Sequence, residues 1–359
     1  MTAATLGIIG GGQLGRMLAL AAAPMGVRCL VVEPAPDAPA GVAAEVLAAA
    51  YDDQKALAEL ARRCDVVTVE LEGVPVDALA WLADRVPVRP GPEAIAVAQD
   101  RLAEKRCFGA LGIRTAPFAR WPDAPEPGPW FAKARRGGFD GRGQVVVDGA
   151  ETLTAAATTL GTEELIVEGV VEFCRELAIL MARGMDGTTR TWPLTETVHR
   201  GGILHSARAP AAGASERQAE AEALVAALAL DLGYVGVLAV ELFDTGDGLV
   251  ANEWAPRVHN SGHWTIEGSV TSQFAQHVRA VLGWPLGDAT VTGDAITLNC
   301  IGALPDPRAV LAVPGANLHV YGKEPRPGRK VGHITVVAPD PDELDRRVGA
   351  LVSVLPGPA

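Results

Sequence analysis

The opening stretch of the chain constrains the fold more than any other, because apolar runs and a helical segment alternate there. It contains in order an apolar run at 5–9, three consecutive glycines at 10–12, a helical stretch at 13–25 and a second apolar run at 27–32. This order predicts a β-α-β unit, and such units build parallel sheets that are covered by helices. The residues at 65–70 predict a further strand of the same sheet.

The glycine loop in this unit has the spacing of a dinucleotide-binding loop. Gly10, Gly12 and Gly15 match G-x-G-x-x-G, and Glu33 lies 18 residues further on, where such folds place the acid that binds a ribose. Glycines let the backbone approach an anion, and a helix N-terminus adds amide donors. A nicotinamide-dependent oxidoreductase is therefore one hypothesis. A tight turn, or a loop that holds another anion, is the alternative.

Length and composition indicate a globular protein of two or three domains rather than a disordered, fibrous or disulfide-stapled one. The chain has 359 residues, of which 48% are hydrophobic and 21% charged, so it can bury a large core. Its five cysteines form no C-x-x-C pair, a pattern typical of reduced thiols in a cytoplasmic protein. The net charge of −12 argues against broad nucleic-acid binding, which requires a basic face.

The longest apolar region, 223–243, carries Asp231 and Glu241, and these charges argue against a membrane span. We therefore expect a cytoplasmic protein without nucleic-acid or membrane partners. The acidic balance does not argue against a small anionic substrate, because a few local cations outweigh distant charges that are screened by salt.

A second glycine-rich loop follows an apolar segment that ends near Lys133. Four glycines lie within residues 137–143, preceded by two arginines and followed by an apolar run at 145–147. Such a strand-loop-strand hairpin can fold over phosphates with its backbone amides, while the lysine supplies a point charge. The loop lacks the G-K-[ST] helix start of a Walker motif. A mobile surface hairpin is the alternative interpretation.

Two acidic residues are predicted to lie opposite each other on a β-hairpin. Residues 236–244 predict one strand, 245–248 a turn and 249–253 the returning strand. In a symmetric register Glu241 and Glu253 are cross-strand neighbours, with Cβ atoms about 5 Å apart. Two ionised carboxylates at that distance repel unless a cation bridges them or one is protonated, and oxygen ligands alone suit Mg2+. A slip of one residue would separate the two carboxylates, and solvated glutamates at a strand end are the simpler alternative.

The segment after this hairpin is rich in polar donors. Arg257, His259 and His263 follow the second glutamate closely. The two histidines have the i, i+4 spacing of a helical zinc site, but the Asn-Ser-Gly between them opposes a helix and no H-E-x-x-H is present. A loop of donors beside paired carboxylates instead favours binding of a charged reacting group.

The pattern along the rest of the chain divides it into three regions. Prolines place a first boundary near residue 95, and residues 93–111 predict a single helix. Residues 215–232 predict another helix, which is rich in alanine with charges on one side. The second boundary lies near residue 285, after which proline- and glycine-rich turns predict short strands.

Four segments of the chain resemble one known family. They are GIIGGGQLGRM at 7–17, RRGGFDGRGQ at 135–144, NEWAPRVHNSGHW at 252–264 and YGKEPRPGRKVGH at 321–333. In this order they resemble the N5-carboxyaminoimidazole ribonucleotide synthetases, which are ATP-grasp enzymes of de novo purine biosynthesis, over nearly the whole chain. The last two segments are specific, whereas the first alone is weak.

The resemblance implies an α/β and α+β chain of three domains and a homodimer. The domains would be a Rossmann-like parallel sheet at 1–95, an ATP-grasp domain at 96–285 and a small β-rich domain at 286–359. The implied reaction converts ATP, bicarbonate and 5-aminoimidazole ribonucleotide to N5-carboxyaminoimidazole ribonucleotide, ADP and phosphate. Bicarbonate would attack the γ-phosphate, and the resulting carboxyphosphate would carboxylate the amine directly or through CO2. The residues agree, since phosphoryl transfer depends on cations rather than on a covalent nucleophile.

Carried over position by position, the resemblance also implies which residues bind ATP. They are Arg101, Lys133, Gly138, Phe139, Asp140, Gly141, Arg142, Gly143, Gln144, Glu168, Gly169, Val170, Val171, Glu176, His199, Asn252 and Glu253. Residues 168–171 would form the hinge that faces the adenine, and Glu176 would bind the ribose.

The remaining implied residues hold the metal and the other substrates. Glu241 and Glu253 would ligate Mg2+, with Mn2+ as an alternative, and Arg257 and His259 would stabilise carboxyphosphate. The residues implied for the imidazole ribonucleotide are Asp140, Arg142, His259, Lys323, Arg329 and Lys330.

Two positions depart from the family pattern: Phe139 stands where tyrosine is usual, and Ala134 where threonine or arginine is usual. Neither departure removes a charge that the chemistry needs, so we expect activity. The alternatives are another ATP-grasp ligase, the nicotinamide oxidoreductase and an inactive nucleotide-binding regulator. The paired glutamates and Lys133 disfavour the oxidoreductase, and their retention together with Arg257 and His259 disfavours the regulator.

Overall fold

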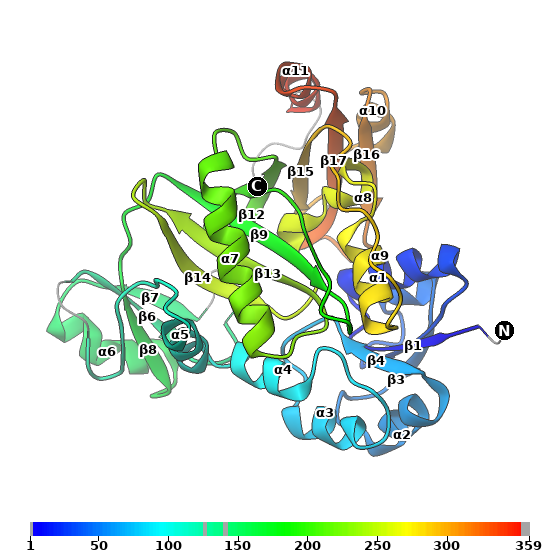
Figure 1. Ribbon diagram of the computed structural model, residues 1–359. Coiled ribbons are helices and arrows are strands. Elements are labelled where there is room, and N and C mark those ends of the chain that lie inside the picture. Colours follow the sequence, from blue (N-terminus) through cyan, green and yellow to red (C-terminus); the bar gives the residue numbers. More distant parts are fainter. Residues whose placement is uncertain (1–2, 125–127, 139–142, 353–359) are drawn as a thin grey trace.

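The computed structural model describes residues 3–124, 128–138 and 143–352 (Figure 1). Across these residues the strands form sheets of four, nine and four members. Some of the residues implied for ATP and substrate lie outside the described residues, namely Phe139, Asp140, Gly141 and Arg142.

The N-terminal part is a parallel sheet with helices packed on it, as the β-α-β pattern predicts. The strand order is β3-β2-β1-β4, and the pairings are parallel. The strands are β1 (Thr5–Ile9), β2 (Arg28–Glu33), β3 (Glu45–Ala48) and β4 (Val66–Val69). The helices and 3-10 turns are α1 (Gln13–Ala22), η1 (Ala23–Met25), η2 (Pro39–Val42), α2 (Gln54–Arg63) and α3 (Val76–Ala83). β1 and β4 are buried along their whole length, as expected for a sheet covered on both faces.

The single helix predicted at 93–111 is wrong. Two helices, α4 (Pro92–Ala98) and α5 (Arg101–Ala110), are separated at Asp100. The Asp100 carboxylate accepts a hydrogen bond of 3.0 Å from the Leu102 amide, and a side chain that caps an amide in this way starts a new helix. Because of this break, the first turn of α5 lies against the central sheet.

A small antiparallel sheet follows, with the order β5-β8-β6-β7. Its strands are β5 (Phe118–Arg120), β6 (Trp130–Ala134), β7 (Gln144–Val147) and β8 (Leu165–Gly169), and α6 (Ala150–Leu160) packs on it. β6 and β7 pair directly, so the strands predicted on either side of the second glycine-rich loop are confirmed. Figure 1 shows this sheet and α6 to one side of the large central sheet.

The central sheet runs β14-β13-β9-β11-β12-β15-β17-β16, with β10 beside β9. Its strands are β9 (Arg175–Arg183), β10 (Thr189–Thr191), β11 (Thr195–Arg200), β12 (Ile203–Ala209), β13 (Gly236–Asp244), β14 (Leu249–Ala255), β15 (Asp294–Ile301), β16 (Ala316–Val320) and β17 (Lys330–Ala338). The helix predicted at 215–232 is α7 (Ser215–Asp231), which packs on one face of β9 and β13. The other face packs on α9 (Gln273–Val281), after η3 (Asn260–Gly262) and α8 (Thr265–Gly268).

The strands after residue 285 continue the central sheet. β15 pairs with β12, and β17 pairs with β15. β15 and β17 have eight and nine residues and are longer than the short strands that the turn residues predict, because those residues mark only the connections. The helices α10 (Pro307–Leu311) and α11 (Pro341–Val352) pack against this part.

One hydrophobic cluster joins the N-terminal sheet to the central sheet. It includes Leu18 of α1 and Phe274 of α9, and Figure 1 shows these two helices side by side. A buried hydrogen bond of 2.8 Å also joins Thr68 of β4 to Nε2 of His277 on α9. Because Nδ1 of His277 accepts from the Val237 amide, Nε2 carries the proton and donates to Thr68. These contacts hold the end of β4 beside the central sheet.

Candidate active site

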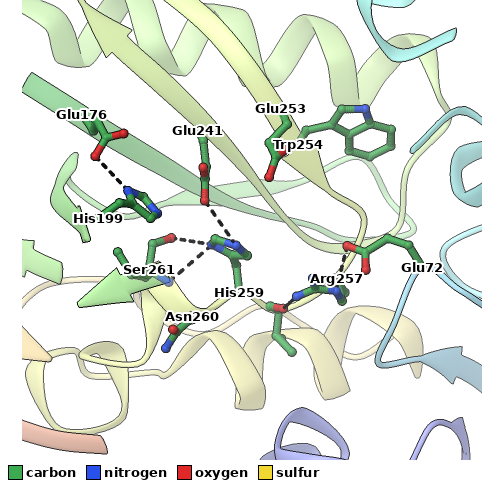
Figure 2. Close-up of polar contacts among 12 residues, drawn as sticks. Glu72, Glu176, His199, Glu241, Glu253, Trp254, Arg257, His259, Asn260 and Ser261 are labelled. Carbon is green, nitrogen blue, oxygen red and sulfur yellow. Dashed lines mark hydrogen bonds and ion pairs between the residues drawn. The ribbon is translucent and has the colours of Figure 1, made fainter. Parts of the chain in front are cut away.

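One face of the central sheet carries acidic residues that the sequence singles out. Val237 and Ala239 of β13 face α9, and because side chains alternate along a strand, Glu241 is next on that face. Glu176 of β9 lies on the same face, because its cross-strand partner is Phe243. Figure 2 shows both carboxylates on the side of the sheet where the loop after β14 lies.

The two predicted carboxylates are opposite each other, and a β-bulge makes this possible. Next to the turn, Leu242 pairs with Ala251, an offset that would bring Glu241 opposite Asn252. The register shifts at this point, so Asn252 is passed over and Glu241 pairs with Glu253. Such an extra residue in one strand is a β-bulge. The predicted pairing is confirmed, but it depends on Asn252 as well as on the turn.

The two carboxylates differ in their electrostatic surroundings. Burial, and next the charge of Glu253, raise the pKa of Glu241 to about 7. Burial would also raise the pKa of Glu253, but its ion pair with Arg101 (2.6 Å) outweighs burial and lowers that pKa to about 2. The Glu253 side chain is 40% exposed, against 18% for Glu241, so a ligand can reach it. The pKa values of the two carboxyl groups therefore move in opposite directions, as expected of two carboxylates that are held close together.

His259 faces Glu241 from the loop after β14. Its Nδ1 accepts a hydrogen bond of 3.3 Å from the Ser261 amide, so in the neutral ring the proton is on Nε2. This nitrogen lies 3.5 Å from Oε1 of Glu241 (Figure 2). Burial, and next the charge of Arg257, lower the pKa of His259 to about 3. His259 is therefore a neutral hydrogen-bond donor at physiological pH and not a cation.

Arg257 supplies positive charge in the same loop. Its Nε lies 2.8 Å from Oε1 of Glu72, in the segment that follows β4 (Figure 2). Val258 between the two predicted catalytic residues is fully buried, and His259 has an extended backbone. Arg257 therefore contacts the segment after β4, whereas His259 contacts Glu241.

Glu176 and His199, both implied for ATP, contact each other. Oε2 of Glu176 lies 2.8 Å from Nδ1 of His199 on β11. Burial would lower the pKa of His199, but this hydrogen bond and the charge of Glu241 raise it. The sheet face therefore brings together residues implied for the nucleotide and for the metal (Figure 2).

The small sheet carries residues implied for the phosphates and the adenine. Lys133 of β6 and Glu168 of β8 form an ion pair of 2.9 Å. Arg101 connects this sheet to the central one, because its guanidinium contacts both Glu253 and, at 3.1 Å, the Gly138 carbonyl. At the ends of β7 and β8, or directly beside them, lie further implied ATP residues, Gly143, Gln144, Gly169, Val170 and Val171.

The C-terminal cations approach from β17 and the segment before it. Lys330 begins β17, and its charge acts on Glu241 and on His259. Lys323 donates a hydrogen bond to Gln13, the first residue of α1, and burial lowers the pKa of this lysine. Arg329 donates to a carbonyl of its own segment at 3.3 Å. The segment 323–330, which carries these cations, therefore lies between the first glycine loop and the carboxylate pair.

An internal carboxylate occupies the first glycine loop. The Gly12 and Gly15 amides donate hydrogen bonds of 2.7 Å to the two oxygens of Glu70, which follows β4, and the Gly11 amide donates to Glu33. A Cβ on Gly12 would lie 2.6 Å from Oε1 of Glu70, so the missing side chain permits this approach. The groups that a dinucleotide fold uses for pyrophosphate and ribose are thus paired within the protein. This pairing argues against the oxidoreductase.

Four charged residues near the site were not predicted from the sequence, because no motif marks them. Glu70 and Glu72 follow an apolar strand, and Glu104 and Lys105 lie on α5, 2% and 1% exposed. Buried charges of this kind are rare. Recognising Asp100 as a helix cap would have placed Arg101 on the same helix face as the two α5 residues.

In the parts of the chain that the structure describes, no group of three or more His, Cys, Asp or Glu side chains could hold a metal ion. A cation at the carboxylate pair would therefore take its other ligands from elsewhere, as Mg2+ does when it shares substrate phosphates. Among the same residues, no helix is both long and apolar enough to span a membrane.

Three family models match successive parts of the chain. They are the ribonucleotide synthetase preATP-grasp domain at 3–99, the ATP-grasp domain at 127–274 and the phosphoribosylaminoimidazole carboxylase C-terminal domain at 295–347. Together with the parallel N-terminal sheet and the charged face of the central sheet, these matches define an ATP-grasp ligase.

Relatives that match over the whole length show to which family of ATP-grasp ligases the chain belongs. The N5-carboxyaminoimidazole ribonucleotide synthase of Pseudomonas aeruginosa is 44% identical, with 98% of this chain and 99% of that protein covered. The crystal structure of the synthetase from Thermus thermophilus has a TM-score of 0.92 at 46% identity, with 98% of both chains covered. The Aspergillus clavatus synthase in complex with ADP and 5-aminoimidazole ribonucleotide has a TM-score of 0.89 at 30% identity, again with 98% of both chains covered. The chain therefore belongs to the N5-carboxyaminoimidazole ribonucleotide synthase family, and the resemblance seen in the sequence is confirmed.

Proposed function

We propose that this chain uses ATP and bicarbonate to carboxylate 5-aminoimidazole ribonucleotide in purine biosynthesis, giving N5-carboxyaminoimidazole ribonucleotide, ADP and phosphate. One observation carries the proposal: the carboxylate pair Glu241–Glu253 lies between cations of α5 and the small sheet on one side and those of the following loop and β17 on the other. The relative that was solved with ADP and 5-aminoimidazole ribonucleotide supports the choice of substrates.

The carboxylate pair fits a divalent cation. Both ligands are oxygens, they are cross-strand partners, and burial together with the charge of Glu253 raises the pKa of Glu241. Glu241 and Glu253 would hold Mg2+, or Mn2+ in its place. Bound there, the ion would neutralise charge that develops on the transferred phosphoryl group.

The residues of the small sheet would bind the nucleotide. Lys133 and Arg101 would neutralise its phosphates, helped by the backbone amides around Gly138. The end of β8 and the residues after it, 168–171, would face the adenine, and Glu176 with its partner His199 would bind the ribose. Asn252 would lie beside the phosphates next to Glu253. We keep Asp140 and Arg142 in this proposal on the resemblance alone.

Arg257 and His259 would act on bicarbonate in different ways. Arg257 is charged and would attract bicarbonate and stabilise carboxyphosphate after the attack on the γ-phosphate. His259 has a pKa of about 3, so it would orient the anion with a neutral N–H and add no charge. Lys323, Arg329 and Lys330 would bind the phosphate of the imidazole ribonucleotide, because clustered cations recognise such a group.

We further propose three domains at 1–95, 96–285 and 286–359, a cytoplasmic location and a homodimer. The three family-model matches, which succeed one another along the chain, support the division into domains. Location and assembly rest on the family resemblance.

The experiment that tests the function measures phosphate release from ATP. The purified chain is given MgATP and bicarbonate, with and without 5-aminoimidazole ribonucleotide, and we expect release to depend on all three. Release that is independent of the ribonucleotide would refute the substrate assignment and favour another ATP-grasp ligase. No release under any condition would favour the inactive regulator.

A further inference from the structure

The helix α5 presents three charged residues to three consecutive residues of β14. Arg101, Glu104 and Lys105 have i, i+3 and i+4 spacing, so they share one face of the helix. Arg101 forms the ion pair with the Glu253 side chain described above. The other two residues contact the backbone on either side of Glu253.

Glu104 and Lys105 hold the two peptide groups that flank Glu253. The Nζ of Lys105 donates a hydrogen bond of 2.5 Å to the Asn252 carbonyl, which belongs to the peptide before Glu253. The Trp254 amide, which belongs to the peptide after it, donates a hydrogen bond of 2.7 Å to Oε1 of Glu104. The peptide groups before and after Glu253 are therefore both held by one helix.

The β-bulge at Asn252 explains why β14 needs these hydrogen bonds from α5. β14 is at the edge of the central sheet, and the register shift passes over Asn252. A bulge disrupts the ladder locally, and without an outside contact the offset next to the turn would bring Glu241 opposite Asn252. Burial raises the pKa of Glu104 to about 8 and lowers the pKa of Lys105, so placing these two ionisable side chains here costs free energy that a stable fold alone does not require. A role in fixing the register explains why buried charges stand here.

Lys105 also links the two halves of the site. Its Nζ lies 3.5 Å from Oε2 of Glu168, the residue that we assign to the adenine hinge. The same ammonium group thus contacts the strand implied for the nucleotide and the strand implied for the metal. Metal binding and nucleotide binding would be coupled through α5.

We propose that Glu104 and Lys105 are positioning residues, which hold the 252–254 segment so that the Glu253 carboxylate stands opposite Glu241 as a metal ligand. This inference rests on the metal role given to that pair in the proposed function. Neither residue touches a substrate or the reacting atoms in this scheme.

The test measures how strongly Mn2+ improves binding of ADP, by titration calorimetry with and without the metal. Glu104→Gln keeps an oxygen acceptor for the Trp254 amide, whereas Glu104→Met removes it. We expect Glu104→Met and Lys105→Met to reduce the Mn2+-dependent gain by about 10- to 100-fold, as for other residues that support metal ligands. Glu104→Gln should retain the gain within about threefold, because the hydrogen bond persists.

The matched control is Arg106→Met, which removes a neighbouring charge from α5. Arg106 is exposed, so the gain should remain within about twofold, as for surface substitutions elsewhere. An equal loss in Glu104→Met and Glu104→Gln would overturn the proposal, and so would an unchanged gain in Glu104→Met and Lys105→Met. Metal-free ADP affinity should stay near that of the unaltered chain in Glu104→Met, which a general loss of folding would not allow.

Two further measurements keep the test decisive. Glu253→Gln should remove the Mn2+-dependent gain. If the Mn2+-dependent improvement of ADP binding persists in Glu253→Gln, the metal role of Glu253 is wrong. If Glu253→Gln abolishes that improvement but Glu104→Met and Lys105→Met keep it in full, only the positioning role is refuted. If the α5 variants do not fold, hydrogen exchange of the unaltered chain decides. The Trp254 amide should exchange slowly, and rapid exchange would overturn the proposal.

Discussion

Replacing Glu70 by glutamine tests whether an internal carboxylate holds the first glycine loop. In the native chain its two oxygens accept amide hydrogen bonds of 2.7 Å each. Glutamine keeps one acceptor and turns an NH2 group towards the other glycine. One charge-assisted bond, worth about 1.5–3 kcal/mol, is lost and a buried amide is left unpaired.

Relief of burial offsets part of this loss, since burial raises the pKa of Glu70 and so disfavours its charged form. We expect Glu70→Gln to lower the free energy of unfolding by about 2 kcal/mol, seen as a lower urea midpoint at an unchanged slope. Glu59→Gln removes an exposed ion pair and should leave the urea midpoint nearly unchanged, because exposed ion pairs contribute little to stability. A Glu70→Gln midpoint equal to that of the unaltered chain would refute the reasoning. Acetate at about 0.1 M should stabilise Glu70→Ala selectively, by occupying the vacated anion position.

Three further predictions concern Glu253, two buried histidines and Lys323. Glu253→Gln should lower turnover by at least about 10^3-fold in the phosphate-release assay, because metal stabilisation of a transition state is worth several kcal/mol; near-normal turnover would exclude an essential role. Burial lowers the pKa of His263 and His333 well below 6.5, so the unfolded chain binds more protons below pH 6.5. Stability should therefore be highest well above that pH and fall by about 1 kcal/mol per histidine between pH 6.5 and 5.5; pH-independent urea midpoints between 7.5 and 5.5 would contradict this. Lys323→Met should raise the KM for 5-aminoimidazole ribonucleotide by about 10- to 100-fold with little change for ATP, whereas Arg326→Met, which removes an exposed cation of the same segment, should leave both constants near normal.

The hairpin shows how far sequence patterns carry the candidate site. The turn at 245–248 and the strand at 236–244 are where the pattern predicts them, and Glu241 pairs with Glu253. The assumption of a symmetric hairpin register predicted the right pair, although it took no account of the bulge at Asn252. That bulge is held by Lys105, a residue far away in the sequence, so no local pattern could reveal it.

The helix break at Asp100 and the anion in the first glycine loop are both features that the sequence patterns used here did not predict. Residues 93–111 contain a helix cap at Asp100 that hydrophobic periodicity ignores, and two helices result. The glycine loop has the spacing of a cofactor site, but its anion is Glu70, which the fold of β4 brings to it. Spacing predicts the shape of a loop, whereas only the tertiary structure shows which anion fills it.

Three strands of the N-terminal sheet, β1, β2 and β4, were predictable because they are largely buried and therefore read as continuous apolar runs. The fourth strand, β3, is only partly buried and was not predicted. The C-terminal strands were less predictable than those three. β15 and β17 pair with each other along nearly their whole length, and β15 also pairs with β12. The sequence pattern shows the prolines and glycines of the connections but not these long pairings. Long-range pairing, not local propensity, decides where those strands end.

The central claim is that ATP phosphorylates bicarbonate when 5-aminoimidazole ribonucleotide is present. It is tested most directly by supplying bicarbonate labelled with 18O and examining the released phosphate by mass spectrometry. Because a bicarbonate oxygen attacks the γ-phosphate and stays with it when carboxyphosphate breaks down, we predict one 18O in each phosphate released in the ribonucleotide-dependent reaction. Phosphate whose new oxygen comes from water would contradict the account.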